Sequence, residues 1–551
     1  METNKLTQRR LLYNPQLQNA EMTEKTFAVR QAQFALLLNN IVNETENSIP
    51  QHHIIIGQRG MGKTMMLKRM EAELHKEQYR RQFIPLFFRV EQNNVKKLAK
   101  FWLNALDALA DSLESEDAPT ELLTEIDKTI TELSKKALEE VADEAYRYLM
   151  NTCRELHRRP VLLIDNIDIV FNRLGNRDES KREQWALRRL LSENGAPVVI
   201  GTSVTTTNDF VAYKMPFYDF FNIQFLQKLS AEEFSTLLHN LATVTNSDTT
   251  VFQTIQQTAS RQKTLLELTN GTPRVAVKLF EQLSNGSSDD ITTNLNMLID
   301  FMTPHYKAEI EKLPTQQQII LHAIALHWDA ISLRELSIAT GMKNNLLSPQ
   351  LKRLIDDGWV ETTPACQDKG NAYFISDRFF NTYCLIRCGN RQHRNRIYGL
   401  ARFLERFYES ETAEKPVNHM CNEYKIEDDL SFTMVFESSQ VWKEIEQSEQ
   451  EDSDNKPNVW LTTNQDWWLR IGSMVIKSGY GSWLLEMLEK KGYDVVLSPY
   501  YTAIQAIEIE RKNSKKDKRG KTEAEIYLNS RAVEIGKPAK MIMEKIRKYM
   551  N

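Results

Sequence analysis

The fold of this chain is decided at residues 54–64, which read IIIGQRGMGKT. The apolar run that ends at Ile56 is typical of a buried strand, and the segment from Met65 to Leu74 is predicted to be a helix. Between them lies the pattern G-x-x-x-x-G-K-[ST], in which a glycine-rich loop carries phosphates at the start of a helix. Strand, loop and helix together predict a nucleotide site.

Each part of this loop has an expected task. The glycines let the backbone curl so that several N–H groups point at the phosphates of ATP or ADP. Lys63 is expected to bridge the β- and γ-phosphates, and the hydroxyl of Thr64 to bind Mg²⁺. The predicted nucleotide-binding residues of the loop are Gly57, Gln58, Arg59, Gly60, Met61, Gly62, Lys63, Thr64 and Met65.

Three further segments carry polar residues suited to this site. A second apolar strand, VLLID at 161–165, ends in Asp165, which is expected to hold Mg²⁺ with Thr64 in the manner of a Walker B acid, although many buried strands end in Asp. The strand at 198–203 ends in Thr202 and Ser203, which are candidates for sensing the γ-phosphate. Pro273 and Arg274 open a later helix, and Arg274 is either a phosphate sensor or a surface cation.

Bulk properties set the limits of the interpretation. At 551 residues the chain exceeds one domain several times, and its 41% apolar and 26% charged residues are those of an ordinary soluble protein. A net charge of −4 restricts nucleic-acid contacts to a local patch. With no apolar run of membrane-spanning length and no secretory start, the sequence predicts a cytoplasmic protein without membrane contact.

The cysteines are few and scattered. Five in number, they favour reduced thiols over a disulfide framework. Cys384 and Cys388 lie one helical turn apart, but no second pair of metal ligands is near them in the sequence. We therefore expect no metal site there.

The order of elements predicts several domains. Apolar strands alternate with helices up to about residue 228, which indicates a parallel α/β sheet, and helices dominate afterwards. The predicted domains are 1–50, a lead-in with an adenine-side helix over 27–43; 51–228, a P-loop core with a helical insertion at about 93–158; 229–300, a helical lid; 301–392, a winged helix; and 393–551, a mostly α-helical domain.

The predicted winged helix has helices at 315–327, from 332, and at 344–356, followed by strands at 359–362 and 372–375. The second helix begins with Ser332 and has Glu335 three residues on, which is a capping box. In this topology the third helix would enter the major groove of DNA. Its predicted exposed contact residues are Asn344, Asn345, Ser348, Gln350, Lys352 and Arg353.

Two basic runs could add phosphate contacts, although charge runs are usually solvated loops. Their members are Arg387, Arg391, His393, Arg394, Arg396, Arg402 and Arg406 in the first, and Arg511, Lys512, Lys515, Lys516, Lys518, Arg519 and Lys521 in the second.

With these motifs assembled, the chain resembles the AAA+/STAND group of P-loop ATPases, and most of all the archaeal-type ATPases and origin-recognition initiators with a winged helix after the lid. The resemblance covers about residues 25–410. It implies that the segment 27–34 wraps the adenine, with Val29 and Arg30 in contact with the base. It also implies oligomers and an effector protein encoded nearby.

One position departs from that group. Its hydrolysing members place Glu or Asp directly after the Walker B acid to activate water, and this chain has Asn166. Because an amide cannot take the proton of water, we expect slow hydrolysis unless Asp168 acts as the base. If the strand continued, its period of two would put Asp168 on the same side as Asn166.

The sequence therefore leaves three functions open. The first is a slowly hydrolysing nucleotide switch that couples ATP to a partner. The second is a DNA-binding ATPase of initiator or regulator type. The third is a nearly inactive ATPase that serves as a scaffold.

Overall fold

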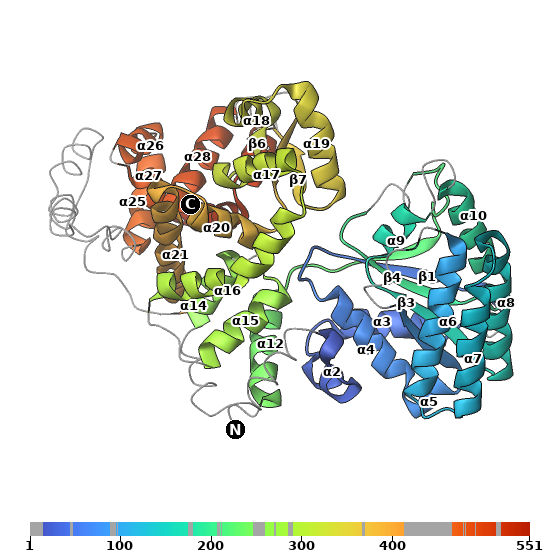
Figure 1. Ribbon diagram of the computed structural model, residues 1–551. Coiled ribbons are helices and arrows are strands. Elements are labelled where there is room, and N and C mark those ends of the chain that lie inside the picture. Colours follow the sequence, from blue (N-terminus) through green and yellow to red (C-terminus); the bar gives the residue numbers. More distant parts are fainter. Residues whose placement is uncertain are drawn as a thin grey trace. The chain divides into compact units, whose positions relative to one another are not determined.

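A computed structural model describes residues 15–44, 48–88, 95, 97–174, 180–206, 210, 212–245, 259–268, 271–284, 290–365, 370–412, 465–477, 479, 481–490, 492–513 and 519–550. The chain divides into two compact units (Figure 1). Unit 1 contains Met1–Asp248 and Thr272–Glu281, and unit 2 contains Thr249–Gly271 and Gln282–Asn551. Three of the lysines of the second basic run, at 515, 516 and 518, lie outside the described residues.

Unit 1 is built on a sheet of five strands, and its strands are parallel, as the sequence predicted. Its strand order is β2-β3-β4-β1-β5. The strands are β1 (His52–Ile56), β2 (Phe83–Phe88), β3 (Arg159–Ile164), β4 (Val198–Ser203) and β5 (Phe221–Phe225). Because neighbouring strands are parallel, the residues that follow β1, β3 and β4 emerge at the same edge of the sheet.

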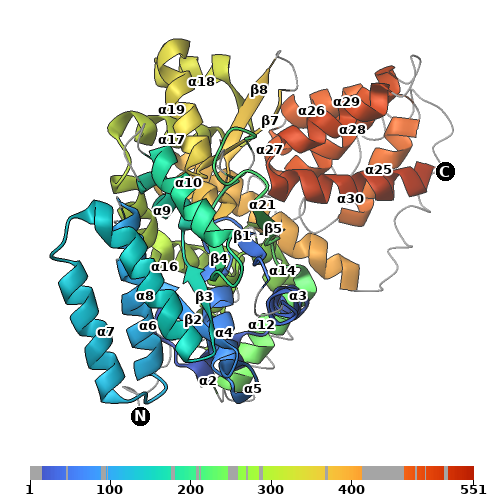
Figure 2. The same ribbon diagram turned by 90° about the vertical axis from the view of Figure 1, so that its right-hand side faces the viewer.

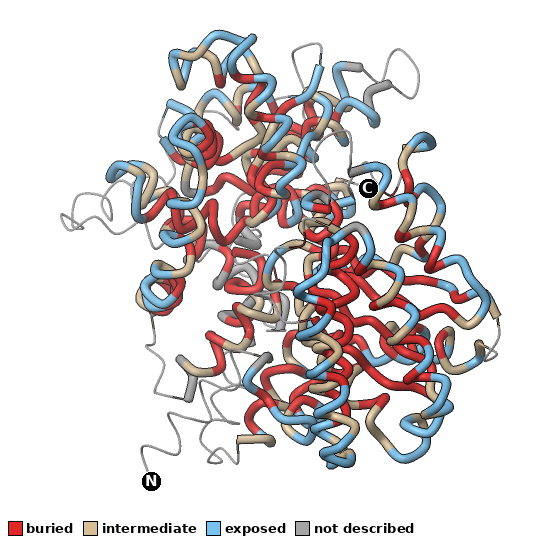
Figure 3. Tube along the Cα trace, turned by 45° about the vertical axis from the view of Figure 1, so that its right-hand side comes forward, coloured by how far each residue is buried: buried red, intermediate tan, exposed pale blue. Residues whose placement is uncertain are grey.

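Helices cover both faces of this sheet (Figure 1). Ile54 and Ile56 belong to a hydrophobic cluster with α6 (Leu98–Glu114) and α8 (Leu138–Glu155), whereas Ile55 belongs to a second cluster with α3 (Gln31–Val42) and α4 (Lys63–Leu74). This alternation is the period of two of a strand that is buried on both faces. Figure 3 shows the strands as a buried layer between helices that have exposed outer sides.

The predicted helical insertion is present as α6, α7 (Thr120–Leu133) and α8, and the predicted helix before β4 is α10 (Ser180–Leu191). Shorter elements complete unit 1: η1 (Pro15–Leu17), α2 (Ala20–Thr26), α5 (Glu77–Arg80), α9 (Ile167–Arg173), α12 (Ala231–Val244) and most of α15 (Pro273–Ser284). The predicted lid, 229–300, is thus divided between the units, with α12 in unit 1 and α14 (Ala259–Leu268) in unit 2.

Two expectations about unit 1 were incomplete. The helix predicted over 27–43 begins only at Gln31, because Arg30 adopts a left-handed backbone conformation with φ of 66°. The strands β2 and β5 were not predicted. Both lie at edges of the sheet, and β2 contains Pro85, a residue that sheets tolerate at an edge.

Unit 2 contains the elements of the predicted module in the predicted order. They are α17 (Thr315–His327), β6 (Ile331–Ser332), α18 (Leu333–Thr340), α19 (Asn344–Asp356), β7 (Val360–Pro364) and β8 (Asn371–Ile375), and the three strands form an antiparallel sheet. The capping box of Ser332 and Glu335 is formed at the start of α18. The long helix α16 (Ile291–Glu311) precedes the module and runs through the boundary predicted at 300.

The remainder of unit 2 is helical, as predicted: α20 (Arg378–Arg387), α21 (Arg391–Thr412), α25 (Gln465–Lys477), α26 (Gly481–Lys490), α27 (Tyr493–Val496), α28 (Ser498–Asn513), α29 (Arg519–Ser530) and α30 (Val533–Met550). Figure 2 shows α25 to α30 gathered into one bundle. In the part of the chain that is described, no helix is both long and apolar enough to cross a membrane.

A buried ion pair joins the module to this bundle. The guanidinium of Arg378 lies 2.8 Å from the carboxylate of Glu534, which also accepts a hydrogen bond from the indole N–H of Trp328 at 2.5 Å. Both partners of the pair are almost wholly buried, where removal of one charge is costly. The module and the C-terminal helices are therefore parts of one compact unit rather than independent bodies.

Candidate functional site

The loop between β1 and α4 has the backbone that a phosphate cradle requires. Gly60 and Gly62 have φ of 81° and 84°, in the region that favours glycine. A Cβ on Gly60 would lie 3.3 Å from the Cβ of Arg274, and one on Gly57 would lie 3.1 Å from the Cβ of Leu226. The loop is therefore closely enclosed, and side chains in place of its glycines would be strained or crowded.

Lys63 is a buried cation at the start of α4. Its amine donates hydrogen bonds to the carbonyls of Gly57 at 2.5 Å and Gln58 at 3.1 Å. Burial lowers the pKa of Lys63 to about 8, against the opposing effect of Asp165 and Asp168, and the cations of Arg59 and Arg274 lower it further. Three cations thus share one small region of unit 1, which is the arrangement that attracts a polyanion such as a nucleotide phosphate.

The carboxylate of Asp165 is held by two hydroxyl groups. Thr64 donates to its Oδ2 at 2.7 Å, and Thr202 donates to its Oδ1 at 2.5 Å. Thr202 also accepts the backbone N–H of Asn166 at 2.9 Å. The hydroxyl of Ser203 instead donates to the carbonyl of Thr205, so of the two candidates on β4 only Thr202 contacts Asp165.

The chain turns sharply after Asp165. The strand β3 ends at Ile164, and Asn166 adopts a left-handed conformation with φ of 54° and ψ of 53°, from which α9 begins at Ile167. The expectation that Asp168 shares a strand side with Asn166 is therefore wrong, because Asp168 lies in the first turn of a helix. Asn is one of the few residues other than Gly that adopts this conformation readily.

Asp168 nevertheless lies in the site, because its charge acts on both Lys63 and Asp165. Burial raises its pKa from 3.8 to about 6, although it accepts hydrogen bonds from its own N–H and that of Ile169. Its Oδ1 is buried and has no hydrogen-bond partner among the described residues. A carboxylate with a pKa near 6 that is not fully hydrogen-bonded is suited to act as a general base.

Two arginines approach the loop from outside it. The guanidinium of Arg30 donates to the carbonyl of Met61 and, at 2.6 Å, to that of Gln227. The Arg30 side chain therefore supports the backbone of the loop. The neighbouring Val29 is half-buried. The N–H of Arg274 donates to the carbonyl of Gly60 at 3.3 Å, and its side chain lies over that glycine.

The family of AAA ATPase domains matches residues 26–200, a range that includes Arg30, the glycine-rich loop and Asp165. Residues 26–200 are therefore similar to AAA ATPase domains. No curated protein matches the sequence of the chain.

Solved structures with some likeness to the chain include three archaeal proteins. A Walker-type ATPase of Pyrococcus abyssi is 17% identical, with 65% of this chain and 96% of that chain covered and a TM-score of 0.46. The ORC2 protein of Aeropyrum pernix is 13% identical, with 67% and 94% covered and a TM-score of 0.44. The ORC1 protein of the same organism, solved with DNA, is 12% identical, with 73% and 98% covered and a TM-score of 0.38.

The side chains around Asp165 fit Mg²⁺. This hard cation prefers oxygen ligands, and the hydroxyl of Thr64 and the carboxylate of Asp165 lie side by side. These two residues would hold the ion, which would neutralise charge on the β- and γ-phosphates.

The nucleic-acid candidates lie on α19 in unit 2. Asn344, Asn345, Ser348, Lys352 and Arg353 are exposed. Gln350, which was also expected to be exposed, is half-buried because it forms hydrogen bonds with Gln316 and Gln317 of α17. Contact of α19 with DNA stays a prediction.

The first basic run does not form one exposed stripe. Arg387 forms an ion pair with Asp300, and Arg394 donates to the carbonyl of Gly389. Arg396 lies over the ring of Trp328, with 4.6 Å from its guanidinium carbon to the ring centroid, and burial lowers its pKa. Arg387 lies at the end of α20 and Arg394 and Arg396 lie on α21, and these three side chains have different partners.

We expect Lys63→Ala to weaken ATP binding by more than about 100-fold, because the phosphates lose a buried charge-assisted hydrogen-bond donor. Titration with a fluorescent ATP analogue measures the effect. Lys68→Ala is the matched control, because Lys68 lies on the same helix and pairs with Glu71. Unchanged affinity in the Lys63 variant, with circular dichroism unchanged, would show that the loop does not hold phosphate.

Asp168→Asn should stabilise the chain at pH 7 by about 3 kcal/mol and much less near pH 4. The pKa of Asp168 in the folded chain, about 6, lies above its ordinary 3.8, so folding stability falls as pH rises from about 4 to 6 while the buried carboxyl ionises. The neutral amide does not have this penalty. Urea unfolding at both pH values tests the sign, with Asp143→Asn on the exposed side of α8 as the control; equal effects at both pH values contradict the assignment.

Proposed function

We propose that this chain is an ATP-binding switch that hydrolyses ATP slowly and passes its nucleotide state to a partner through unit 2. The AAA ATPase domain supplies the binding site. One observation supports the switch above all others: Arg274, which lies against Gly60 of the loop, belongs to Thr272–Glu281, and this segment of unit 1 continues into unit 2 at both of its ends.

Nucleotide binding has a straightforward basis in the side chains. Lys63 would exchange its bonds to the Gly57 and Gln58 carbonyls for bonds to phosphate oxygens. Thr64 and Asp165 would hold Mg²⁺, while Thr202 fixes the orientation of the carboxylate. Arg30 keeps the loop in place through the Met61 carbonyl.

Slow hydrolysis follows from the residues that face the attacking water. Asn166 can orient a water molecule but cannot accept its proton. Asp168 can accept it, because its pKa is about 6 and one of its oxygens has no hydrogen-bond partner among the described residues. It reaches the site from the first turn of α9 rather than from the position after Asp165, so we propose that it is a working but poorly placed base.

The link to the partner is the start of α15. ATP differs from ADP at this site by a γ-phosphate, and Arg274 is a cation above the loop that receives it. A contact of Arg274 with this phosphate would stabilise one position of Thr272–Glu281, and unit 2 is joined covalently to both ends of this segment. The nucleotide would then act on unit 2 by a shift in population between two states.

We propose an effector protein as the partner of unit 2 and homo-oligomers as the assembled form. Duplex DNA is the second candidate partner. The observation in its favour is that α19 exposes three polar and two cationic side chains, Asn344, Asn345, Ser348, Lys352 and Arg353, of types that contact bases and phosphates. Leu346 is also exposed on this helix, which suits a protein surface better.

Asn166→Asp should raise ATP turnover by about tenfold or more, because a carboxylate next to Asp165 adds a general base and Asp tolerates the left-handed backbone. Asp168→Ala should lower the wild-type rate by about 100-fold. Phosphate release under saturating ATP measures both variants. Fast wild-type turnover that Asp168→Ala leaves unchanged would refute the proposal that Asp168 is the base.

Arg274→Ala should uncouple the nucleotide from unit 2. We expect the preference for ATP over ADP to fall by about tenfold, the typical value of one hydrogen bond to a charged group. Hydrogen exchange in α14 and α16 should then no longer differ between the ATP-bound and ADP-bound protein. Arg274→Lys, which keeps the charge, should retain part of the difference in hydrogen exchange between the ATP-bound and ADP-bound protein. If Arg274→Ala keeps the full difference, Arg274 does not couple the nucleotide to unit 2.

A further inference from the structure

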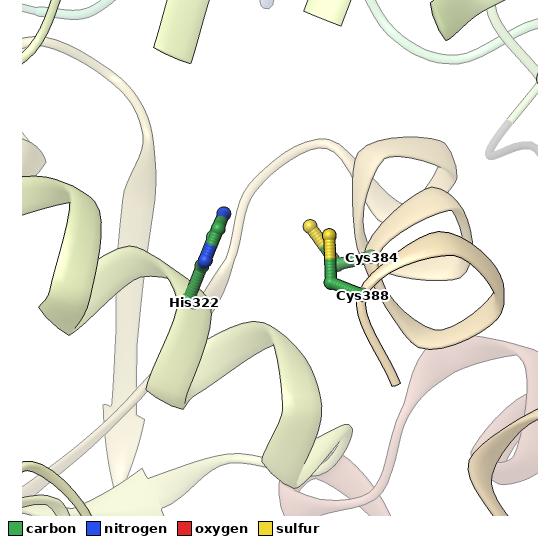
Figure 4. A group of neighbouring side chains, drawn as sticks. All are labelled: His322, Cys384 and Cys388. Atoms are coloured by element: carbon green, nitrogen blue, oxygen red, sulfur yellow. The ribbon is translucent and has the colours of Figure 1, made fainter. Parts of the chain in front are cut away.

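Three metal-ligating side chains meet in unit 2, remote in sequence from the nucleotide site. A ring nitrogen of His322 and the sulfurs of Cys384 and Cys388 all lie within 4.8 Å of one another. Figure 4 shows the imidazole projecting from α17 and the two sulfurs projecting from α20 toward it. The proximity of the two cysteines was visible in the sequence, but the histidine, 62 residues before Cys384 in the chain, was not.

The backbone fixes this arrangement without help from the three side chains. The N–H groups of Cys388 and Gly389 both donate to the carbonyl of Cys384, at 2.8 and 2.9 Å, which keeps both sulfurs on one side of the helix end. The buried amide of Asn381 donates to the carbonyl of Ala325 at 2.5 Å and so ties α20 to α17 one turn away. The ligands are therefore brought together by packing that exists in the chain alone.

One ring nitrogen of His322 is available to bind a ligand. Its Nε2 is buried and has no hydrogen-bond partner among the described residues. A buried polar atom without a partner is uncommon in native structures, and a bound ion is one of the explanations.

The two cysteines offer a second type of metal ligand. Cysteine binds metals as the thiolate, so each thiol would lose its proton on binding. Cys384 itself is buried, whereas Cys388 is exposed, so a cation can reach the pair from the side of Cys388.

We propose that His322, Cys384 and Cys388 form a three-ligand site for Zn²⁺, with a water molecule as the fourth ligand. Two sulfur donors and one imidazole are the ligand types that Zn²⁺ takes in tetrahedral sites. Bond lengths of about 2.0 to 2.3 Å place tetrahedral ligands roughly 3.5 Å apart, so these side chains need to close by roughly 1 Å. Binding releases the protons of the two thiols to solvent and needs no oxidant.

The site would clamp the first helix of the module to α20, the helix whose Arg378 is paired with Glu534. Because α17 and α20 are also joined by the hydrogen bond from Asn381 to the carbonyl of Ala325, folding should not depend on the ion. Loss of the metal should therefore leave the secondary structure and the ATP affinity of the chain intact.

Cobalt, which replaces zinc and reports its geometry by colour, tests the proposal on the full reduced chain. We expect one Co²⁺ per chain, with sulfur-to-cobalt charge-transfer absorption and the intense visible bands of a tetrahedral site. Cys384→Ser and Cys388→Ser should remove the charge-transfer band in part, and His322→Ala should weaken binding by more than about 100-fold, because even outer-shell partners of metals contribute 10- to 100-fold. Zn²⁺ should displace the cobalt.

Two control variants bracket the site. His327→Ala removes another histidine of the same helix, α17, and Cys153→Ala removes a buried thiol of unit 1. Both variants should give the same cobalt spectrum as the wild type. Circular dichroism without metal shows whether each variant folds. The proposal is overturned if the reduced wild type gives no tetrahedral spectrum, or if the spectrum survives in all three ligand variants. Air oxidation to a Cys384–Cys388 disulfide, with no cobalt bound after reduction, would also overturn it and would mark the pair as redox-active.

Discussion

The nucleotide site depends on one buried carboxylate and its two hydroxyl donors. Asp165 follows β3, Thr64 lies in the first turn of α4 after the glycine-rich loop, and Thr202 lies near the end of β4. A buried carboxylate is costly without hydrogen bonds, so these three segments are stable only together. Thr202 extends the constraint by accepting the N–H of Asn166, which fixes the turn into α9. The loop, the acid and the residues that would face water are thereby held in one fixed relation, as catalysis and metal binding require.

Several residues that form this arrangement lower the stability of the fold. Burial lowers the pKa of Lys63 to about 8 and raises that of Asp168 to about 6, and each shift means that ionisation of the buried group opposes folding at neutral pH. Arg30 and Asn166 both have left-handed backbones, which ordinary side chains avoid. Proteins tolerate such conflicts mainly at functional sites. These four residues lie at or next to the glycine-rich loop and Asp165, whereas Ile54, Ile55 and Ile56 of β1 follow the simple pattern of a buried strand.

The sequence predicted those parts that local patterns determine. The strand, loop and helix around Lys63, the strand before Asp165, and the helices α17 and α19 were placed nearly to the residue, because apolar period, capping residues and glycine turns act over a few positions. It failed where tertiary packing decides: the edge strands β2 and β5, the inward turn of Gln350, and the stacking of Arg396 on Trp328. Most of the predicted site residues do lie around the loop, but Ser203 turns away from Asp165. The neighbourhood of His322 and Cys384 could not be predicted, because helix packing joins residues that no sequence spacing relates.

Asn166 illustrates how the structure changes an argument from sequence. In the sequence alone, an Asn directly after Asp165 indicates that the usual catalytic acid has been lost. In the structure it occupies a left-handed turn, where Asn is favoured for its backbone alone, and its N–H satisfies the hydroxyl that orients Asp165. The conformational requirement is thus a sufficient reason for Asn at this position, whatever the rate of hydrolysis. If Asp168 is the base, as we propose, the rate of hydrolysis then depends on this buried carboxylate, whose charge acts on both Lys63 and Asp165.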